Sequence, residues 1–251
     1  MIVSFTDFGP NGPYLGQMMV AAIKENPTVR ILDLVNDAPA FRPDLAGYLL
    51  AALLPDLPLE TVVLGVIDPG VGSSRRPVVV HTGGRWLVGP DNGLFAPALS
   101  RFGGGAAWQI HDHTPHLSAS FHGRDLFAPA AAHLADSHAP SGVPIDPDDL
   151  IGVDAPADKD AVIYIDGYGN VMTGRRADTL PSDAKLHANG YRLAPARTFS
   201  EVLPGTAMWY RNAIGLAELA VNQGHADEAL GLSLGTPLSF DHPASETPDG
   251  D

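Results

Sequence analysis

Short β-branched runs alternate with segments of helical periodicity through the first half of the chain. The runs Ile2–Thr6, Val29–Val35 and Thr61–Val66 are dominated by Val, Ile and Leu, which predicts strands. Between them, Tyr14–Glu25 and Asp44–Leu54 carry apolar residues at helical spacing. Strands that alternate with helices pair in parallel. The pattern therefore predicts an N-terminal α/β sandwich domain with a mostly parallel sheet.

A hairpin signal interrupts this alternation. Val78–His81 and Trp86–Val88 flank a turn centred on Gly83 and Gly84, and paired glycines suit the tight turns that join antiparallel strands. We therefore expect an antiparallel element in the same sheet. The alanine-rich segment Phe127–His138 predicts one more helix.

The composition changes beyond residue 138. Residues 139–159 are rich in Pro, Asp, Gly and Ala, which is typical of a connection. Short strand-like runs with turn signals follow, such as Ala161–Asp166 and Ala207–Tyr210, and they predict a smaller antiparallel, β-barrel-like domain. We predict an N-terminal domain over 1–145, a linker over 146–159, a C-terminal β domain over 160–240 and a disordered tail over 241–251.

Charge and composition exclude several classes of function. The 15 Lys and Arg against 29 Asp and Glu give a formal net charge of −14, which repels nucleic acid. The chain has no Cys, so disulfides, thiolate metal sites and cysteine nucleophiles are excluded. No basic leader with an apolar core precedes the first strand, and no apolar run approaches the roughly 20 residues of a membrane span. We expect a cytoplasmic protein with no membrane or nucleic-acid partner.

Polar residues and glycines gather where the predicted strands end, which is where open α/β sheets bind ligands. The segments are Thr6–Gly9, Val66–Arg76, Gly89–Gly93 and Ser120–Asp125. Within them, Asp7 suits a pair of ribose hydroxyls or a turn cap. Asp68 and Arg75 suit a functional ion pair or an ordinary surface pair, and His122 can be a base, an acid, an anchor or a structural residue. Asp91–Gly93 predicts a structural turn.

Two further interpretations concern the neighbours of His122. Arg124 and Asp125 are expected to pair and support its loop. Upstream lies a group that offers a metal-site alternative, although its spacing differs from that of known motifs: His111, Asp112, His113 and His116.

The C-terminal part has one polar cluster. Asp166, Tyr168 and Asn170 occupy alternate positions, so on a strand or tight hairpin they share one face. A carboxylate, an aromatic ring and an amide suit a ligand with an ammonium group and a purine. The same residues also suit a turn with one core aromatic.

Taken together, the segments resemble the S-adenosyl-L-methionine hydroxide adenosyltransferases, the hydrolase branch of a family that also contains the fluorinating and chlorinating adenosyl enzymes. The resemblance runs from about Ile2 to Phe240. It rests on TDFG at 6–9, IDPGVG with the following Arg at 67–75, GPDNG at 89–93, SFHGRD at 120–125 and D-x-aromatic-GN at 166–170.

The resemblance implies a function and a set of site residues. It implies hydrolysis of S-adenosyl-L-methionine to adenosine and L-methionine by water attacking the ribose C5′, without a cofactor or metal, in a homotrimer with active sites between subunits. The implied residues are the water-activating Asp68, Arg75 and His122, the ribose ligand Asp7, the pocket wall Phe41, the ammonium ligand Asp166, and Tyr168 with Asn170 for adenine.

Three positions bear on the alternatives. Gly123 stands where the fluorinating enzymes are expected to carry a halide-binding serine, which favours hydrolysis over halide transfer. The usual Thr-Asn pair is Thr173-Gly174, and the serine that helps bind methionine in relatives is Ala213. These two departures keep open a non-catalytic sensor of S-adenosyl-L-methionine or adenosine.

Overall fold

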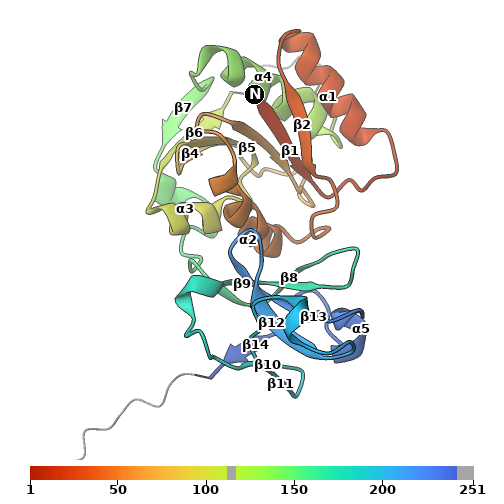
Figure 1. Cartoon of the computed structure of the whole chain (residues 1–251). Coiled ribbons are helices and arrows are strands. Elements are labelled where there is room, and N and C mark those ends of the chain that lie inside the picture. Colours follow the sequence, from red (N-terminus) through yellow and green to blue (C-terminus); the bar gives the residue numbers. More distant parts are fainter. Residues whose placement is uncertain (112–116, 242–251) are drawn as a thin grey trace, which may run out of the picture. The chain divides into compact units, whose positions relative to one another are not determined.

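The computed structural model describes residues 1–111 and 117–241 (Figure 1). By its internal contacts the chain divides into two compact units, Met1–Ala157 and Asp158–Asp251. The predicted disordered tail falls almost wholly outside the described residues. Each unit has its own apolar core, one around Met18 and Phe127 and the other around Leu186 and Trp209.

The first unit is built on a seven-stranded sheet of order β2-β1-β3-β5-β4-β6-β7. The pairings make β4 and β7 antiparallel to the other five strands, which confirms a mostly parallel α/β sheet. The strands are β1 Ile2–Thr6, β2 Ile31–Val35, β3 Val62–Val66, β4 Pro77–Thr82, β5 Arg85–Pro90, β6 Ala106–Ile110 and β7 Gly142–Ile145.

Helices cover both faces of this sheet (Figure 1). They are α1 Tyr14–Glu25, α2 Pro43–Leu53, α3 Ala96–Phe102 and α4 Ala128–Ser137. Leu64 of β3 packs in a core with residues of α1 and α4, whereas its neighbour Gly65 faces Phe95, which leads into α3. Because successive strand residues point to opposite faces, α1 and α4 lie on one face and α3, with its contact partner α2, on the other.

The predicted hairpin is confirmed. Thr82 pairs with Arg85 across a two-residue turn in which Gly83 and Gly84 have φ of 56° and 73°. Two positive φ angles in succession suit a turn whose twist matches that of the flanking strands, and glycine adopts them without a Cβ clash.

The segment predicted as a linker has contacts with the first unit. Within residues 146–159, the Ile151 amide donates to Asp91 Oδ1 at 2.9 Å, and Arg101 Nε donates to the Ala157 carbonyl at 2.8 Å. These contacts continue the first unit up to residue 157.

The second unit holds two antiparallel sheets, of order β12-β13-β9-β8 and β11-β10-β14. Its elements are β8 Lys159–Ile165, β9 Val171–Arg176, β10 Leu186–Ala188, β11 Tyr191–Leu193, β12 Ala207–Arg211, β13 Leu216–Val221, α5 Ala226–Leu230 and β14 Leu238–Phe240. The antiparallel prediction is confirmed, but the barrel-like closure is not. Among the described residues only isolated bridges, Ala161 to Pro237 and Pro195 to Trp209, join the two sheets, because the three-residue strands are too short to close a barrel.

In the part of the chain that the structure describes, no helix combines the length and the apolar character needed to cross a bilayer.

Candidate active site

The first unit places two carboxylates at one edge of its sheet. β1 and β3 are parallel neighbours in which Thr6 pairs with Val66, the last residue of each strand. Asp7 and Asp68 follow these strand ends directly or after one residue, so both emerge at the carboxyl edge. This is the edge at which ligands bind in open α/β sheets.

Asp68, Arg75 and His122 come together although they are far apart in the chain. Arg75 Nε donates to both Asp68 oxygens at 3.0 and 3.1 Å, and Arg75 Nη2 lies 2.5 Å from Asp68 Oδ2. The same Nη2 lies 2.8 Å from His122 Nδ1. The Arg75 and Asp68 side chains are only 7% and 6% exposed, so solvent screens their pairing weakly.

This geometry assigns the tautomer of His122. A guanidinium group carries only donors, so Nδ1 of His122 accepts the hydrogen bond from Arg75. An imidazole whose Nδ1 accepts is neutral and carries its proton on Nε2. His122 therefore presents an N–H donor at Nε2.

A π-helical turn holds the loop that bears His122. His122 immediately precedes the π-turn Gly123–Phe127, a rare feature that is often found at functional sites. Arg124 pairs with Asp125 at 2.5 and 2.9 Å, and Asp125 also accepts from the Ser118 amide at 2.9 Å. The hydrogen bond from Arg124, ahead of other causes, lowers the pKa of Asp125. The pair supports the loop, as predicted.

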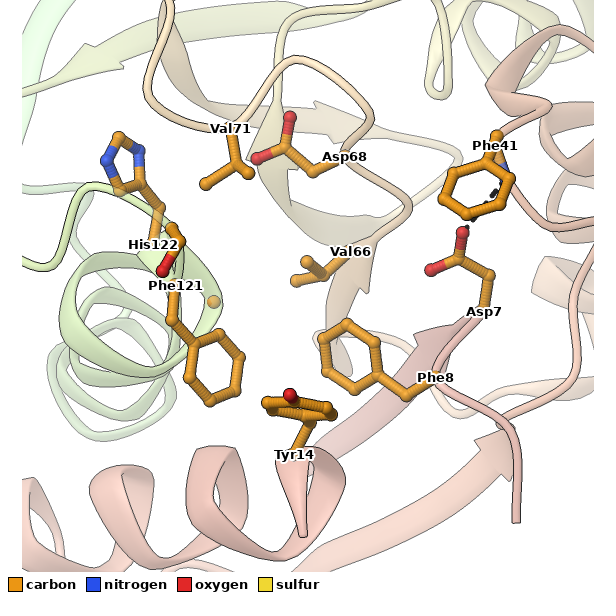
Figure 2. Close-up of a pocket in the computed structure, with 11 residues that line it drawn as sticks. Asp7, Phe8, Tyr14, Phe41, Val66, Asp68, Val71, Phe121 and His122 are labelled. Atoms are coloured by element: carbon orange, nitrogen blue, oxygen red, sulfur yellow. Dashed lines mark hydrogen bonds between the residues drawn. The ribbon is translucent and has the colours of Figure 1, made fainter. Parts of the chain in front are cut away.

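A cavity of about 310 Å³ joins these residues to Asp7. Figure 2 shows Asp7 and Phe41 at one end, Phe121 and His122 at the other, and Asp68 between them. The lining residues are Asp7, Phe8, Tyr14, Phe41, Val66, Asp68, Val71, Ser120, Phe121, His122 and Gly123. Arg75 is not among them: it lies behind Asp68 and His122 and acts on the cavity through these two side chains.

Asp7 is held by the backbone of Phe41. The Phe41 amide donates to Asp7 Oδ2 at 3.0 Å, and Phe41 adopts a positive φ of 60°, which is unusual for a bulky residue. Burial raises the pKa of Asp7 despite this hydrogen bond. The Phe41 side chain is 73% exposed at the mouth of the cavity, where it can cover a ligand.

Three aromatic residues that the sequence analysis did not single out form another wall of the cavity (Figure 2). The Tyr14 and Phe121 rings lie edge to face at 5.4 Å, and Phe8 lies 6.2 and 5.9 Å from them. Such rings exclude water and attract a cation through their faces. Phe8 and Phe121 fall inside the quoted motifs, but a single aromatic residue gives no signal in the sequence that distinguishes a cavity wall from the core.

The polar cluster of the second unit lies on the tight turn between β8 and β9. Asp166 Oδ1 accepts from the amides of Tyr168 and Asn170 at 2.8 and 2.9 Å, and Oδ2 accepts from Asn170 Nδ2 at 3.0 Å. These three residues line a second cavity of about 620 Å³, and the Tyr168 side chain is largely exposed. This cavity belongs to the second unit alone.

Comparison with known protein families also divides the chain into two parts, one in each compact unit. A family model described as the SAM hydroxide adenosyltransferase N-terminal domain matches residues 2–143, and the model of the corresponding C-terminal domain matches residues 160–239. The chain belongs to the SAM hydroxide adenosyltransferase family.

Several relatives support this membership. A protein from Thermus thermophilus named (R)-S-adenosyl-L-methionine hydrolase is 37% identical over 93% of this chain and 96% of its own. One of the same name from Salinispora tropica is 32% identical over 94% and 96%. The crystal structure of an uncharacterized conserved protein from Thermotoga maritima matches with a TM-score of 0.86 at 26% identity, covering 96% of this chain and all of that one.

The structure locates the two departures from the family pattern, Gly174 and Ala213. A side chain at Gly174 meets Lys159, whose backbone oxygen lies 2.8 Å from the position of an added Cβ, so a larger residue does not fit this strand pairing. Ala213 is exposed in the turn after Asn212 and, within the described part of the unit, lies outside the lining of the second cavity.

The metal-site alternative receives no support within the described residues, where no three His, Asp or Glu side chains gather around a common point. Asp112, His113 and His116 lie outside those residues. Asp91 is structural, as predicted, since it accepts from Arg76 Nε and the Ile151 amide, each at 2.9 Å.

Substitution of Arg75 by Lys tests whether the planar guanidinium matters beyond its charge. One ammonium cannot reproduce the fork that contacts both Asp68 and His122. We expect kcat to fall by about 10²-fold with retained folding, measured by steady-state kinetics and thermal unfolding. The matched control is Arg30→Lys on the loop before β2. Wild-type kcat in Arg75→Lys would show that any cation serves at this position.

Proposed function

We propose that the protein hydrolyses S-adenosyl-L-methionine to adenosine and L-methionine. The observation that carries this proposal is the convergence of Asp68 and His122, backed by Arg75, on the cavity that also contains Asp7. The relatives named (R)-S-adenosyl-L-methionine hydrolase, 32–37% identical over almost the whole chain, support the same activity.

Substrate binding is divided among the predicted residues. Asp7 accepts hydrogen bonds from the two ribose hydroxyls, because an ionised carboxylate has two oxygens for two vicinal donors. Phe41 covers the nucleoside at the cavity mouth. Asp166 takes the methionine ammonium group, and Tyr168 and Asn170 hold adenine.

The reaction is an in-line displacement at C5′. The oxygen of water forms a bond to C5′ while the bond from C5′ to sulfur breaks, and the electron pair moves to sulfur to give the neutral thioether of methionine. Sulfonium leaves without protonation, so catalysis must act on the nucleophile. Water has a pKa of about 15.7 in bulk solution and must be oriented and partly deprotonated.

The side chains divide this task as their hydrogen bonds indicate. Asp68 accepts the proton of the water through Oδ1, because this oxygen takes one hydrogen bond from Arg75 whereas Oδ2 takes two. His122 donates from Nε2 to the water oxygen and so orients a lone pair towards C5′. Arg75 holds the Asp68 carboxylate in place through its hydrogen bonds and fixes the tautomer of His122, as a positioning residue.

Identification of the products tests this function. Purified protein incubated with S-adenosyl-L-methionine is expected to yield adenosine and L-methionine in equal amounts, measured by chromatography and mass spectrometry. Methylthioadenosine and homoserine lactone as the products, bound but unconverted substrate, or a 5′-halo-nucleoside in the presence of chloride would each contradict the proposal.

The raised pKa of Asp7 predicts a pH dependence of substrate binding. Protonation removes an acceptor from the ribose contact, so KM rises as the pH falls through the pKa of Asp7. Because burial raises that pKa, the rise in KM begins at a higher pH than an exposed Asp would give. KM measured from neutral to acidic pH checks this, and Asp7→Asn is expected to abolish the dependence. An identical acidic limb in Asp7→Asn would assign the titration to another group.

The homotrimer, the cytoplasmic location and the independence from any cofactor complete the proposal. They rest on the family resemblance and on the sequence. Light scattering on the purified protein checks the assembly, with an expected mass about three times that of one chain; the mass of a monomer would contradict it.

A further inference from the structure

A buried carboxylate lies in the middle of the four-stranded sheet of the second unit. Glu218 is on the inner strand β13 and is 2% exposed. It is directly opposite Tyr210 of β12 on one side and Met172 of β9 on the other, so the three side chains share one face. A buried charge without an ionic partner is costly, so its presence here calls for a function.

The partners of Glu218 are uncharged. The Tyr210 hydroxyl donates to Oε1, and Asn212 Nδ2 donates to Oε2 at 2.7 Å. Asn212 is itself fixed, because its Oδ1 accepts from the amides of Ile214 and Leu216 at 3.1 and 2.9 Å. None of the ion pairs among the described residues includes Glu218. Glu218 thus organises two polar side chains while bringing an uncompensated acidic group.

Glu218 lines the same cavity as Asp166. Burial raises the pKa of Glu218, and the nearby charge of Asp166 acts in the same direction. Tyr210 lines this cavity too, and its ring packs against that of Phe199 at 5.3 Å. The cavity therefore presents two acidic groups and the aromatic rings of Tyr168, Phe199 and Tyr210, an environment that favours a cationic ligand group.

Asp166 by itself has little remaining capacity for a ligand. Three of its roughly four acceptor sites are already used by the Tyr168 amide, the Asn170 amide and Asn170 Nδ2. A second negative charge behind it strengthens the attraction for an ammonium group without requiring a further direct hydrogen bond.

We propose that Glu218 is a positioning residue for the amino-acid end of the substrate: it fixes Tyr210 and Asn212 and adds its negative charge to the field in which Asp166 binds the ammonium group. This inference rests on the proposed function. It makes Glu218 a determinant of specificity, which favours nucleosides that carry an α-ammonium group over those that do not.

Glu218→Gln tests the role of the charge, because the amide keeps the shape and an oxygen acceptor for Tyr210. Two unreactive probes differ in the amino-acid end: S-adenosyl-L-homocysteine has the ammonium group and 5′-methylthioadenosine lacks it. We expect the Kd of the first to rise about tenfold and that of the second to change less than about twofold, by calorimetry. We also expect KM for the substrate to rise while kcat is retained. Glu228→Gln, an exposed position on α5, is the matched control and leaves both affinities unchanged.

If both probes lose affinity equally in Glu218→Gln, Glu218 has only a structural role. If neither probe loses affinity, Glu218 takes no part in binding. Either outcome overturns the inference. If Glu218→Gln does not fold, Glu218→Asp keeps the charge and must preserve the wild-type ratio of the two Kd values to within about threefold. Failure of the wild-type protein to release adenosine would instead contradict the proposed function. Because the probe affinities are measured without turnover, they test the role of Glu218 separately from the proposed function.

Discussion

Replacement of Asp68 by Asn is expected to lower kcat by about 10³-fold with little change in KM, because the variant loses the proposed acceptor for the proton of the attacking water. The amide keeps the shape of the carboxylate, and Asp7 and Phe41 still hold the nucleoside. The measurement is steady-state kinetics with release of adenosine as the readout.

Folding must be checked in the same variant. The Arg75 side chain is only 7% exposed, so its pairing with Asp68 contributes to stability. Breaking a buried ion pair completely lowers the free energy of unfolding by about 3–5 kcal/mol. The loss is smaller in Asp68→Asn, because the amide oxygen still accepts a hydrogen bond from Arg75. Thermal unfolding and adenosine binding therefore accompany the kinetics. Asp56→Asn, at an exposed position after α2, is the matched control and is expected to be fully active. Turnover within tenfold of wild type in a folded Asp68→Asn protein would exclude Asp68 as the proton acceptor.

Replacement of Asp7 by Ala is expected to raise the Kd of adenosine by at least about 100-fold. Two hydrogen bonds from ribose to an ionised, half-buried carboxylate are lost, and each contributes about 1.5–3 kcal/mol to binding. Isothermal calorimetry measures the effect directly, without turnover. The expected matched control is Asp136→Ala, an exposed position on α4, with unchanged affinity.

The ligand provides a second control for Asp7. Wild-type protein is expected to bind 2′-deoxyadenosine more weakly than adenosine, since one of the two hydroxyls is missing. In Asp7→Ala this preference is expected to vanish, because the acceptor for that hydroxyl is gone. A preference for adenosine that survives in Asp7→Ala would assign the ribose contact to another residue.

Much of the fold follows from local patterns in the sequence. The runs that form β1 and β3 are short and apolar, α1 has apolar residues at helical spacing, and the paired glycines of the β4–β5 hairpin adopt the positive φ angles that its turn requires. The strand β13 was not predicted, because its sequence LAELAV combines Ala and Glu, which have low strand propensity, with a charge at a buried position. The strand β7 was missed within a Pro- and Gly-rich segment, where pairing with β6 outweighs local propensity.

The prediction of the site residues depended on the family resemblance rather than on local sequence patterns. Taken singly, Asp68, Arg75 and His122 each had a structural interpretation, and no local rule brings together residues that are 47 positions apart, as Arg75 and His122 are. The position of Arg75 behind the cavity, and the tautomer of His122 that follows from it, are properties of three-dimensional geometry. Glu218 gave no signal, because its partners become visible only when β12 and β13 are paired.

In the proposed mechanism a water molecule held at Asp68 and His122 forms a bond to C5′ of the substrate. Turnover in ¹⁸O-labelled water, followed by mass spectrometry of both products, identifies the origin of the new oxygen. One labelled oxygen is expected in adenosine, at the 5′ position, and none in methionine. Unlabelled adenosine, or label in the product derived from the amino acid, would contradict it.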